Sequence, residues 1–444
     1  MRGCDVLELW FDFSCPYAFL ASRRIRQLGI AIDWRPMLLG GVFRGTGAGD
    51  GPMATISVQK AAHNFLDMHR WAERFGERFR MPVMHPMRTV LALRTLLALP
   101  SPWWPAAIEA LFAAYWQRGD DLTSPQVIAQ ALQAAGVPDD AIADAAGRAG
   151  DPEIKEELRR RTDEAISLGI FGAPAWVLRD RPGAEPLLLW GQDRIAWVEA
   201  LLAGWDLSGP PPGGTRQFAP TVSASPGKQL DVYFDVASPF SYLGLTQLPA
   251  LAAMGTSPRL VPILVGALFR AIGQVDVPIA AMPPAKRRYV AAEMSRWATW
   301  WGVPFDPPRK FPQRTITAQR LCILAADDGF ETGVRVATAL ARGMWAEQRN
   351  LEDPAALRAI LDAIDLPAGT AERWLARTNA PEIKARLAAN TTEAQDAGVF
   401  GVPTFVVDRR QLFWGQDRLE LVAHALTGWI CDPPVPGTDL PGTG

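Results

Sequence analysis

Several residue patterns that would indicate a particular class of protein are missing from this 444-residue chain. Its 4 cysteines form no C-x-x-C pair and show no spacing typical of metal ligands, so we predict no metal site. Cys4 and Cys15 bracket a predicted strand that would hold them too far apart for a disulfide. These absences indicate a reduced, intracellular protein.

The chain also lacks an excess of charge and any long apolar run. A formal net charge of -2 gives no electrostatic reason to expect nucleic acid or an anionic membrane as a partner. No segment approaches the roughly 20 apolar residues of a membrane-spanning helix. Asp5 and Glu8 stand where a secretion signal would be apolar. We therefore expect a cytoplasmic protein.

What the sequence does contain is a long repeat. Leu9-Trp-Phe-Asp-Phe-Ser-Cys-Pro16 matches Val232-Tyr-Phe-Asp-Val-Ala-Ser-Pro239, and Gly169-Ile-Phe-Gly-Ala-Pro174 matches Gly398-Val-Phe-Gly-Val-Pro403. Trp-Gly-Gln-Asp-Arg occurs at 190–194 and again at 414–418. Because order and spacing hold, we interpret the chain as a tandem duplication with a period of about 225 residues.

The duplication sets the predicted domain boundaries. The first domain covers residues 1–207, with a helical insertion at about 50–168, and the second covers 229–431, with an insertion at about 276–397. Between them, residues 208–228 are rich in Pro, Gly and Ser and are predicted to be a linker. Residues 432–444 are predicted to be a flexible tail.

The same order of elements is expected in both domains. A strand (Val6–Phe13 or Leu230–Val236) leads into a helix that begins at Cys15-Pro16 or Ser238-Pro239. A second strand, a long helical segment ending at Gly169 or Gly398, two more strands and a closing helix follow. A proline directly before a buried strand favours a cis peptide bond at Pro403. We predict an α/β fold with a βαβ unit and a ββα unit around a helical insertion.

These motifs resemble the 2-hydroxychromene-2-carboxylate isomerase family, which is similar to kappa-class glutathione transferases and DsbA-type disulfide oxidases. The resemblance implies two tandem thioredoxin-like domains, each with an inserted all-helical subdomain. It also implies bound glutathione and reversible thiolate addition to a conjugated aromatic enone, in aromatic-compound degradation. The residues that carry it are Asp235 to Leu243, Lys286 with Arg296-Trp297, Gly398 to Pro403, and Phe413 to Arg418.

The resemblance also assigns roles to residues of the second copy. Ser238 would hydrogen-bond the glutathione sulfur, the Val402 backbone would pair with the tripeptide, and Asp417 would hold the γ-glutamyl ammonium. Pro403 and Gln416 are also assigned to glutathione binding. Lys286 would lie near the substrate. The counterparts in the first copy are Cys15, Ala173, Pro174, Gln192, Asp193 and Lys60.

Other interpretations of these residues stay open from the sequence. Ser238 is also a typical helix N-cap, and Asp193 and Asp417 are typical partners of a helix start. Lys60 and Lys286 also suit the solvated face of a helix. Tryptophans at 103, 104, 297, 300 and 301 suit packing within the helical insertions, or some of them suit the wall of an aromatic pocket between the two halves.

Cys15 allows two opposite interpretations. At the start of a helix its thiol pKa would fall and the thiol would be reactive. Alternatively, it is an inert buried cysteine in a degenerate copy.

The prediction is a glutathione-dependent isomerase of a small aromatic substrate, working in the second half. The fused halves would form a pseudo-dimer within one chain, or the chain would form a homodimer. The alternatives are a glutathione transferase or a monothiol–disulfide oxidoreductase using Cys15, and a non-catalytic glutathione-binding module.

Overall fold

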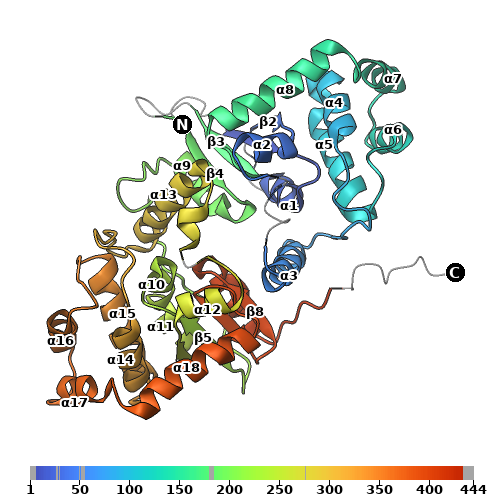
Figure 1. The fold of residues 1–444 in the computed structure, drawn as a ribbon. Helices are drawn as coiled ribbons and strands as arrows, with labels where there is room; N and C mark the ends of the chain where they lie inside the picture. The colour runs from blue at the N-terminus through green and yellow to red at the C-terminus, as the bar shows by residue number, and fades with distance from the viewer. Residues whose placement is uncertain are drawn as a thin grey trace.

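The computed structural model describes residues 7–26, 29, 31–49, 51, 56–179, 185–275 and 277–433. Cys4, and with it the question of a Cys4–Cys15 pair, lies outside the described residues. The described part of the chain forms two halves of the same design, each built on one four-stranded sheet (Figure 1). None of its helices is both long enough and apolar enough to pass through a lipid bilayer.

Each sheet has one parallel and two antiparallel pairings. The order is β2-β1-β3-β4 in the first half and β6-β5-β7-β8 in the second, with β1 and β5 buried along their whole length. Among the pairings of the described residues, only β1 with β2 and β5 with β6 run parallel. The strands are β1 Leu7–Phe11, β2 Ile32–Pro36, β3 Ala175–Leu178, β4 Leu187–Trp190, β5 Leu230–Phe234, β6 Arg259–Pro262, β7 Thr404–Val407 and β8 Gln411–Trp414.

Helices fill the long segment between the second and third strand of each half, as the sequence predicts. The first half has α1 Pro16–Ile25, α2 Leu39–Gly45, α3 Val58–Arg74, α4 Val90–Ala98, α5 Trp104–Ala113, α6 Pro125–Ala134, α7 Asp139–Arg148, α8 Pro152–Ser167 and α9 Ile195–Leu202. The second half has α10 Pro239–Leu245, α11 Leu248–Ala252, α12 Val265–Ala271, α13 Pro284–Trp301, α14 Ile316–Asp327, α15 Phe330–Trp345, α16 Pro354–Asp362, α17 Thr370–Arg377, α18 Pro381–Asp396 and α19 Leu419–Leu426.

The proline turns predicted from the repeat are present in both halves. The helices before them stop at Gly169 and Gly398, whose φ angles of 80° and 78° suit a glycine after a helix. The Ala173-Pro174 and Val402-Pro403 bonds are cis, which confirms the prediction for Pro403. Two further cis bonds, at His85-Pro86 and Phe311-Pro312, were not predicted.

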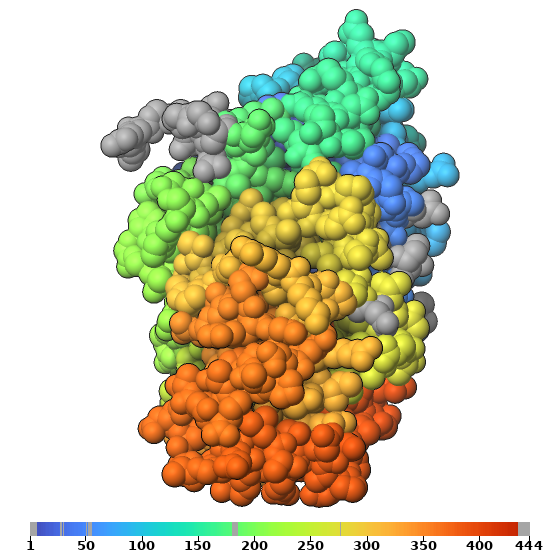
Figure 2. All heavy atoms as spheres, turned by 60° about the vertical axis from the view of Figure 1, so that its left-hand side comes forward, coloured from blue at the N-terminus to red at the C-terminus, as the bar shows by residue number. Residues whose placement is uncertain are grey.

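The halves hold each other by exchanging one helix. The first helix of each insertion, α3 or α13, lies against the last strand of the opposite half (Figure 1). The Arg70 guanidinium donates to the Leu412 carbonyl at 2.7 Å, and that of Arg296 donates to the Leu188 carbonyl at 3.0 Å. In Figure 2 the yellow segment containing α13 lies between the first half and the orange helices of the second. Each exchanged helix therefore covers an edge strand that would otherwise be open.

Several tryptophans lie on the boundary between the halves. Trp197 of α9 contacts Trp297 of α13 with ring centroids 4.8 Å apart, and Trp205 contacts Trp300 at 5.3 Å. The sequence analysis placed Trp297 and Trp300 inside a helical domain or along an aromatic pocket between the halves. Trp297 and Trp300 lie between the halves and contact Trp197 and Trp205 there, because α13 packs on α10 of its own half and also reaches the other half.

Candidate functional site

Ser238 links the start of α10 to the cis-proline turn. Its half-buried hydroxyl donates to the Val402 carbonyl at 3.2 Å and accepts from the Ser241 amide at 3.2 Å. The hydroxyl is therefore a helix cap, as one interpretation predicts, and at the same time contacts the residue before Pro403. These two contacts place Ser238 directly beside Val402.

A buried aspartate fixes the strand-to-helix turn that carries Ser238. The Asp235 carboxylate accepts from the Ala237 amide at 2.9 Å, the Val265 amide at 3.0 Å and the Thr315 hydroxyl at 2.8 Å. Asp12 accepts analogous bonds in the first half, and burial raises the pKa of both carboxyl groups. The sequence analysis assigned neither residue a role, although Phe-Asp occurs at the same place in both copies.

Cys15 occupies the equivalent position in the first half, but in a different environment. Its thiol donates to the Ala173 carbonyl at 3.1 Å, and the residue is only 6% exposed. Burial raises the pKa of the Cys15 thiol to about 12. The expectation of a lowered pKa at this helix start is therefore wrong, since desolvation outweighs the backbone donors of α1. The structure matches the interpretation of a buried thiol.

A tryptophan ring packs against the turn before each cis-proline. Trp414 packs so tightly over Gly401 that a methyl group there would lie 2.6 Å from the indole nitrogen. Trp190 stands over Gly172 in the same way, at 2.7 Å. The Val402 amide beside Gly401 has no hydrogen-bond acceptor among the described residues, although Val402 is 7% exposed. A backbone amide without an acceptor in the protein is able to pair with a ligand or water, so this one is a candidate ligand contact.

The two Trp-Gly-Gln-Asp-Arg motifs meet in the middle of the molecule. Arg194 donates to Asp417 of the other half at 2.9 Å, and Arg418 donates to Asp193 at 2.7 Å. Each arginine also pairs with the exchanged helix of the opposite half, Arg194 with Glu293 at 2.9 Å and Arg418 with Asp67 at 2.8 Å. We call Asp67, Asp193, Arg194, Glu293, Asp417 and Arg418 the central ion cluster.

The electrostatics of this cluster follow from burial and the two guanidiniums. Burial alone would raise the pKa of Asp417, but Arg418 and Arg194 outweigh it and hold the pKa below its ordinary value. The pKa of Glu293 is raised, because burial dominates there. Asp193 and Asp417 therefore do not act only at a helix start. Each carboxylate also accepts a hydrogen bond from an arginine of the other half.

The two glutamines of the motifs are both buried. Gln416 is 4% exposed and Gln192 is 2% exposed. The side-chain amide of Gln192 contacts no hydrogen-bonding partner in the described part of the protein. Neither glutamine belongs to the central ion cluster.

Lys60 and Lys286 do not lie on solvated helix faces. Lys60 Nζ lies 4.8 Å from the ring centroid of Trp414, and Lys286 Nζ lies 5.4 Å from that of Trp190. Burial and the charge of Lys286 lower the pKa of Lys60 to about 8, and burial lowers the pKa of Lys286. The solvated interpretation is wrong because α3 and α13 turn these positions toward the opposite half.

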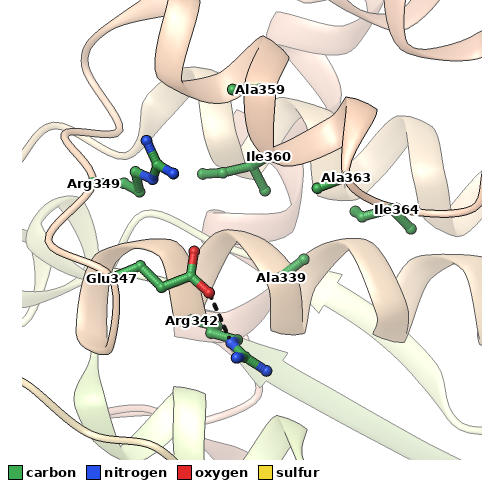
Figure 3. A pocket seen from close by; sticks show the side chains of 8 residues that line it. All are labelled: Ala339, Arg342, Glu347, Arg349, Ala359, Ile360, Ala363 and Ile364. Atoms are coloured by element: carbon green, nitrogen blue, oxygen red, sulfur yellow. Dashed lines mark hydrogen bonds and ion pairs between the residues drawn. The ribbon is translucent and has the colours of Figure 1, made fainter.

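A separate pocket of about 250 Å³ lies between α15 and α16 (Figure 3). Apolar side chains, among them Ile360 and Ile364, form one side, and the Arg342–Glu347 ion pair lies opposite. None of its lining residues is a predicted site residue. The pocket therefore does not bear on the chemistry of the proline turns.

Comparison with known proteins agrees with this architecture. The profile of the DSBA-like thioredoxin domain matches twice, at residues 6–203 and 229–427. The 2-hydroxychromene-2-carboxylate isomerase of Sphingobium xenophagum is 31% identical over 200 residues, which are 45% of this chain and 98% of that protein. Glutathione S-transferase kappa 1 of Caenorhabditis elegans is 24% identical over 209 residues, 45% of this chain and 90% of that protein.

A solved 2-hydroxychromene-2-carboxylate isomerase aligns with a TM-score of 0.39 at 24% identity, covering 45% of this chain and 94% of that one. The isomerase and the transferase named above are both enzymes. Almost the full length of each aligns with less than half of this chain. The two matches of the family profile and the two relatives confirm the predicted resemblance and the duplicated thioredoxin-like fold. The chain belongs to the DSBA-like thioredoxin domain family, and it carries that domain twice.

Proposed function

We propose that the chain is a glutathione-dependent isomerase with its working site in the second half. The observation that carries this proposal is the Ser238 hydroxyl, held beside the carbonyl of Val402 at the cis-proline turn. A hydroxyl at this position can hydrogen-bond a sulfur atom but cannot form a disulfide. The substrate would be a small conjugated aromatic compound, the setting aromatic-compound degradation, and the compartment the cytoplasm.

Two features of the structure fit glutathione. The Val402 amide, which lacks an acceptor among the described residues, could pair with a peptide carbonyl of the tripeptide. In the central ion cluster four carboxylates contact only two guanidiniums, which leaves an excess of negative charge. A γ-glutamyl ammonium near Asp417 would reduce that excess. Gln416 would assist Asp417 in the same role.

When bound, glutathione would supply a thiolate that adds reversibly to a conjugated enone, so that the carbon–carbon bond can rotate. The share of this chain would be orientation and charge stabilisation. Ser238 would donate its hydroxyl proton to the sulfur in place of the Val402 carbonyl, which favours the thiolate. Asp235 would keep Ser238 in place through its bonds to the turn.

The same site could also serve a transferase, since the role of Ser238 toward the sulfur is shared. A redox function through Cys15 is less well supported, because its thiol is buried and its pKa is raised. The exchange of α3 and α13 supports the view that the two halves form a pseudo-dimer within one chain. Light scattering that finds one chain per particle would agree with that view.

The test compares two substitutions at equivalent positions. With glutathione and 2-hydroxychromene-2-carboxylate present, Ser238→Ala should lower the isomerisation rate about 100-fold, the size expected for loss of one donor to a developing charge. Cys15→Ser should leave the rate near that of the unmodified protein. Absorbance spectroscopy follows the conversion. Loss of activity with Cys15→Ser and retention with Ser238→Ala would overturn the proposal, and a stable glutathione adduct as the product would favour a transferase.

A further inference from the structure

A histidine of the first half lies at the proline turn of the second half. His63 belongs to the exchanged helix α3 and is only 5% exposed. Its imidazole Nε2 accepts from the backbone amide of Trp414, the last residue of β8, at 3.2 Å. The next amide, that of Gly415, donates to the Pro403 carbonyl of its own sheet, so in the alternation of a strand the Trp414 amide faces outward. His63 therefore satisfies an amide on the open edge of the sheet.

The imidazole also packs against the two aromatic rings beside this turn. Its centroid lies 5.5 Å from that of Phe400, in an edge-on contact, and 6.3 Å from that of Trp414. These two rings contact each other with centroids 5.0 Å apart. Gly401 follows Phe400 in the chain and packs against the Trp414 indole. The position of His63 thus bears on the backbone directly before Val402.

The first half repeats this arrangement with a different side chain. Tyr289 of α13 is the counterpart of His63, and its hydroxyl accepts from the Trp190 amide at 2.9 Å. The tyrosine ring lies 5.4 Å from Phe171 and 6.3 Å from Trp190. A hydroxyl can accept one hydrogen bond and donate another, and that of Tyr289 lies 3.2 Å from the Glu293 carboxylate. The contact with the edge strand therefore recurs, but its acceptor is an imidazole in the second half alone.

The bond to Trp414 fixes the protonation of His63. An imidazole nitrogen accepts a hydrogen bond only while it carries no proton, so the ring is neutral and its proton is on Nδ1. Burial has the same effect, since it lowers the pKa of His63 to about 4. Asp67, Arg70 and Arg418 are the charged groups that act on the ring, and the two arginines oppose a further positive charge. His63 is thus a fixed acceptor at neutral pH.

We propose that His63 of the first half is a positioning residue for the glutathione site of the second half. It would act through Trp414 and Phe400, without touching glutathione itself. These two rings hold Gly401, and with it the adjoining peptide, in place. The inference rests on the proposed function, in that the ligand at the turn would be glutathione. It adds that the site is complete only while α3 of the other half supplies an acceptor.

Three substitutions in the intact chain test this role by calorimetry with glutathione. His63→Phe keeps a ring but removes the acceptor, so the affinity should fall about tenfold. His63→Tyr copies the arrangement found at α13 and should retain most of the affinity. Tyr289→Phe is the matched control, because it removes the same bond in the first half, and it should change the affinity much less. A side chain that served stability alone would lower the melting temperature without changing the affinity.

Hydrogen exchange in the absence of glutathione measures the positioning itself. In His63→Phe the backbone amides of residues 398–415 should exchange at least about fivefold faster than in the unmodified protein, and those of residues 169–191 should keep their rates. Tyr289→Phe should show the reverse pattern. If His63→Phe does not fold, His63→Met replaces it, since a methionine fills irregular gaps and also lacks a strong acceptor.

Three results would overturn the inference. They are unchanged exchange at residues 398–415 in His63→Phe, unchanged glutathione affinity in that variant, and an equal fall in affinity in His63→Tyr or Tyr289→Phe. Faster exchange at residues 398–415 in His63→Phe, together with an unmodified protein that binds no glutathione, would support the positioning of the turn and contradict only the proposed function.

Discussion

At the scale of single residues, burial decides what the two equivalent helix-start groups can do. The Cys15 thiol and the Ser238 hydroxyl make the same bond, to the carbonyl before a cis-proline. Only Ser238 is partly open to solvent. A helix start lowers a thiol pKa where the thiolate is hydrated or gains hydrogen-bond donors. The buried Cys15 thiol has too few hydrogen-bond donors to offset its desolvation.

Cys15 should therefore resist alkylation in the folded protein. A pKa near 12 leaves very little thiolate at pH 7.5, so we expect iodoacetamide to modify Cys15 at least about a hundredfold more slowly than free cysteine. The rate should rise about tenfold per pH unit as long as the protein stays folded, since the thiolate fraction grows by that factor below the pKa. Peptide mass spectrometry measures the rate, and the protein fully labelled in urea is the reference. Rapid labelling of the folded protein at pH 7.5 would contradict the raised pKa of Cys15.

At the scale of elements, the tryptophan over each proline turn holds the site in shape. Trp414 ends β8 and presses on Gly401, so the last strand and the turn are positioned together. Trp190 and Gly172 repeat this arrangement in the first half. Substitutions of the two glycines form a matched pair, because the added methyl group meets the same indole atom at nearly the same distance.

Gly401→Ala and Gly172→Ala should lower stability equally but differ in ligand binding. Each methyl group would push an indole aside, at a cost of about 1–3 kcal/mol. If the second half holds the working site, only Gly401→Ala should weaken glutathione binding, by about tenfold or more. Calorimetry and thermal melting separate the two effects. An equal loss of glutathione affinity in both variants would show that both turns contribute equally to binding, which contradicts a working site in the second half alone.

Much of each element could be predicted from the sequence, because the signals are local. The strand that begins at Leu230, the helix starts at Pro16 and Pro239, and the helix stops at Gly169 and Gly398 all agree with the structure. The environments of Cys15 and of the two lysines could not be predicted, since they depend on burial and on contacts with the other half. Helical periodicity predicts which face of α3 is apolar, but it does not predict the strand against which that face packs.

At the scale of the whole molecule, the central ion cluster ties the two halves together. Arg194 and Arg418 each contact acidic groups from both halves, and all six charged groups are largely withdrawn from water. Removing one partner from such a cluster leaves buried charges unpaired, which costs much more than losing an exposed pair.

Arg418→Leu should therefore destabilise the chain strongly. Asp67 and Asp193 would each lose a guanidinium, at a cost of about 3–5 kcal/mol. Urea unfolding should show a clearly lower midpoint, and limited proteolysis should become faster. Arg410→Leu is the matched control, since its pair with Asp432 is exposed, and it should unfold close to the unmodified protein. An unchanged midpoint for Arg418→Leu would mean that the cluster does not hold the halves together.

The covalent joining of the two halves has a consequence for how their chemistry can change over time. In an assembly of two identical chains, every substitution appears at both sites at once, so a change that disables one disables both. Here the halves exchange α3 and α13 within one chain, and each position mutates alone. One half can keep a serine while its counterpart acquires a cysteine and closes over it. Fusion thus permits a division of labour in which one half acts and the other serves as its scaffold.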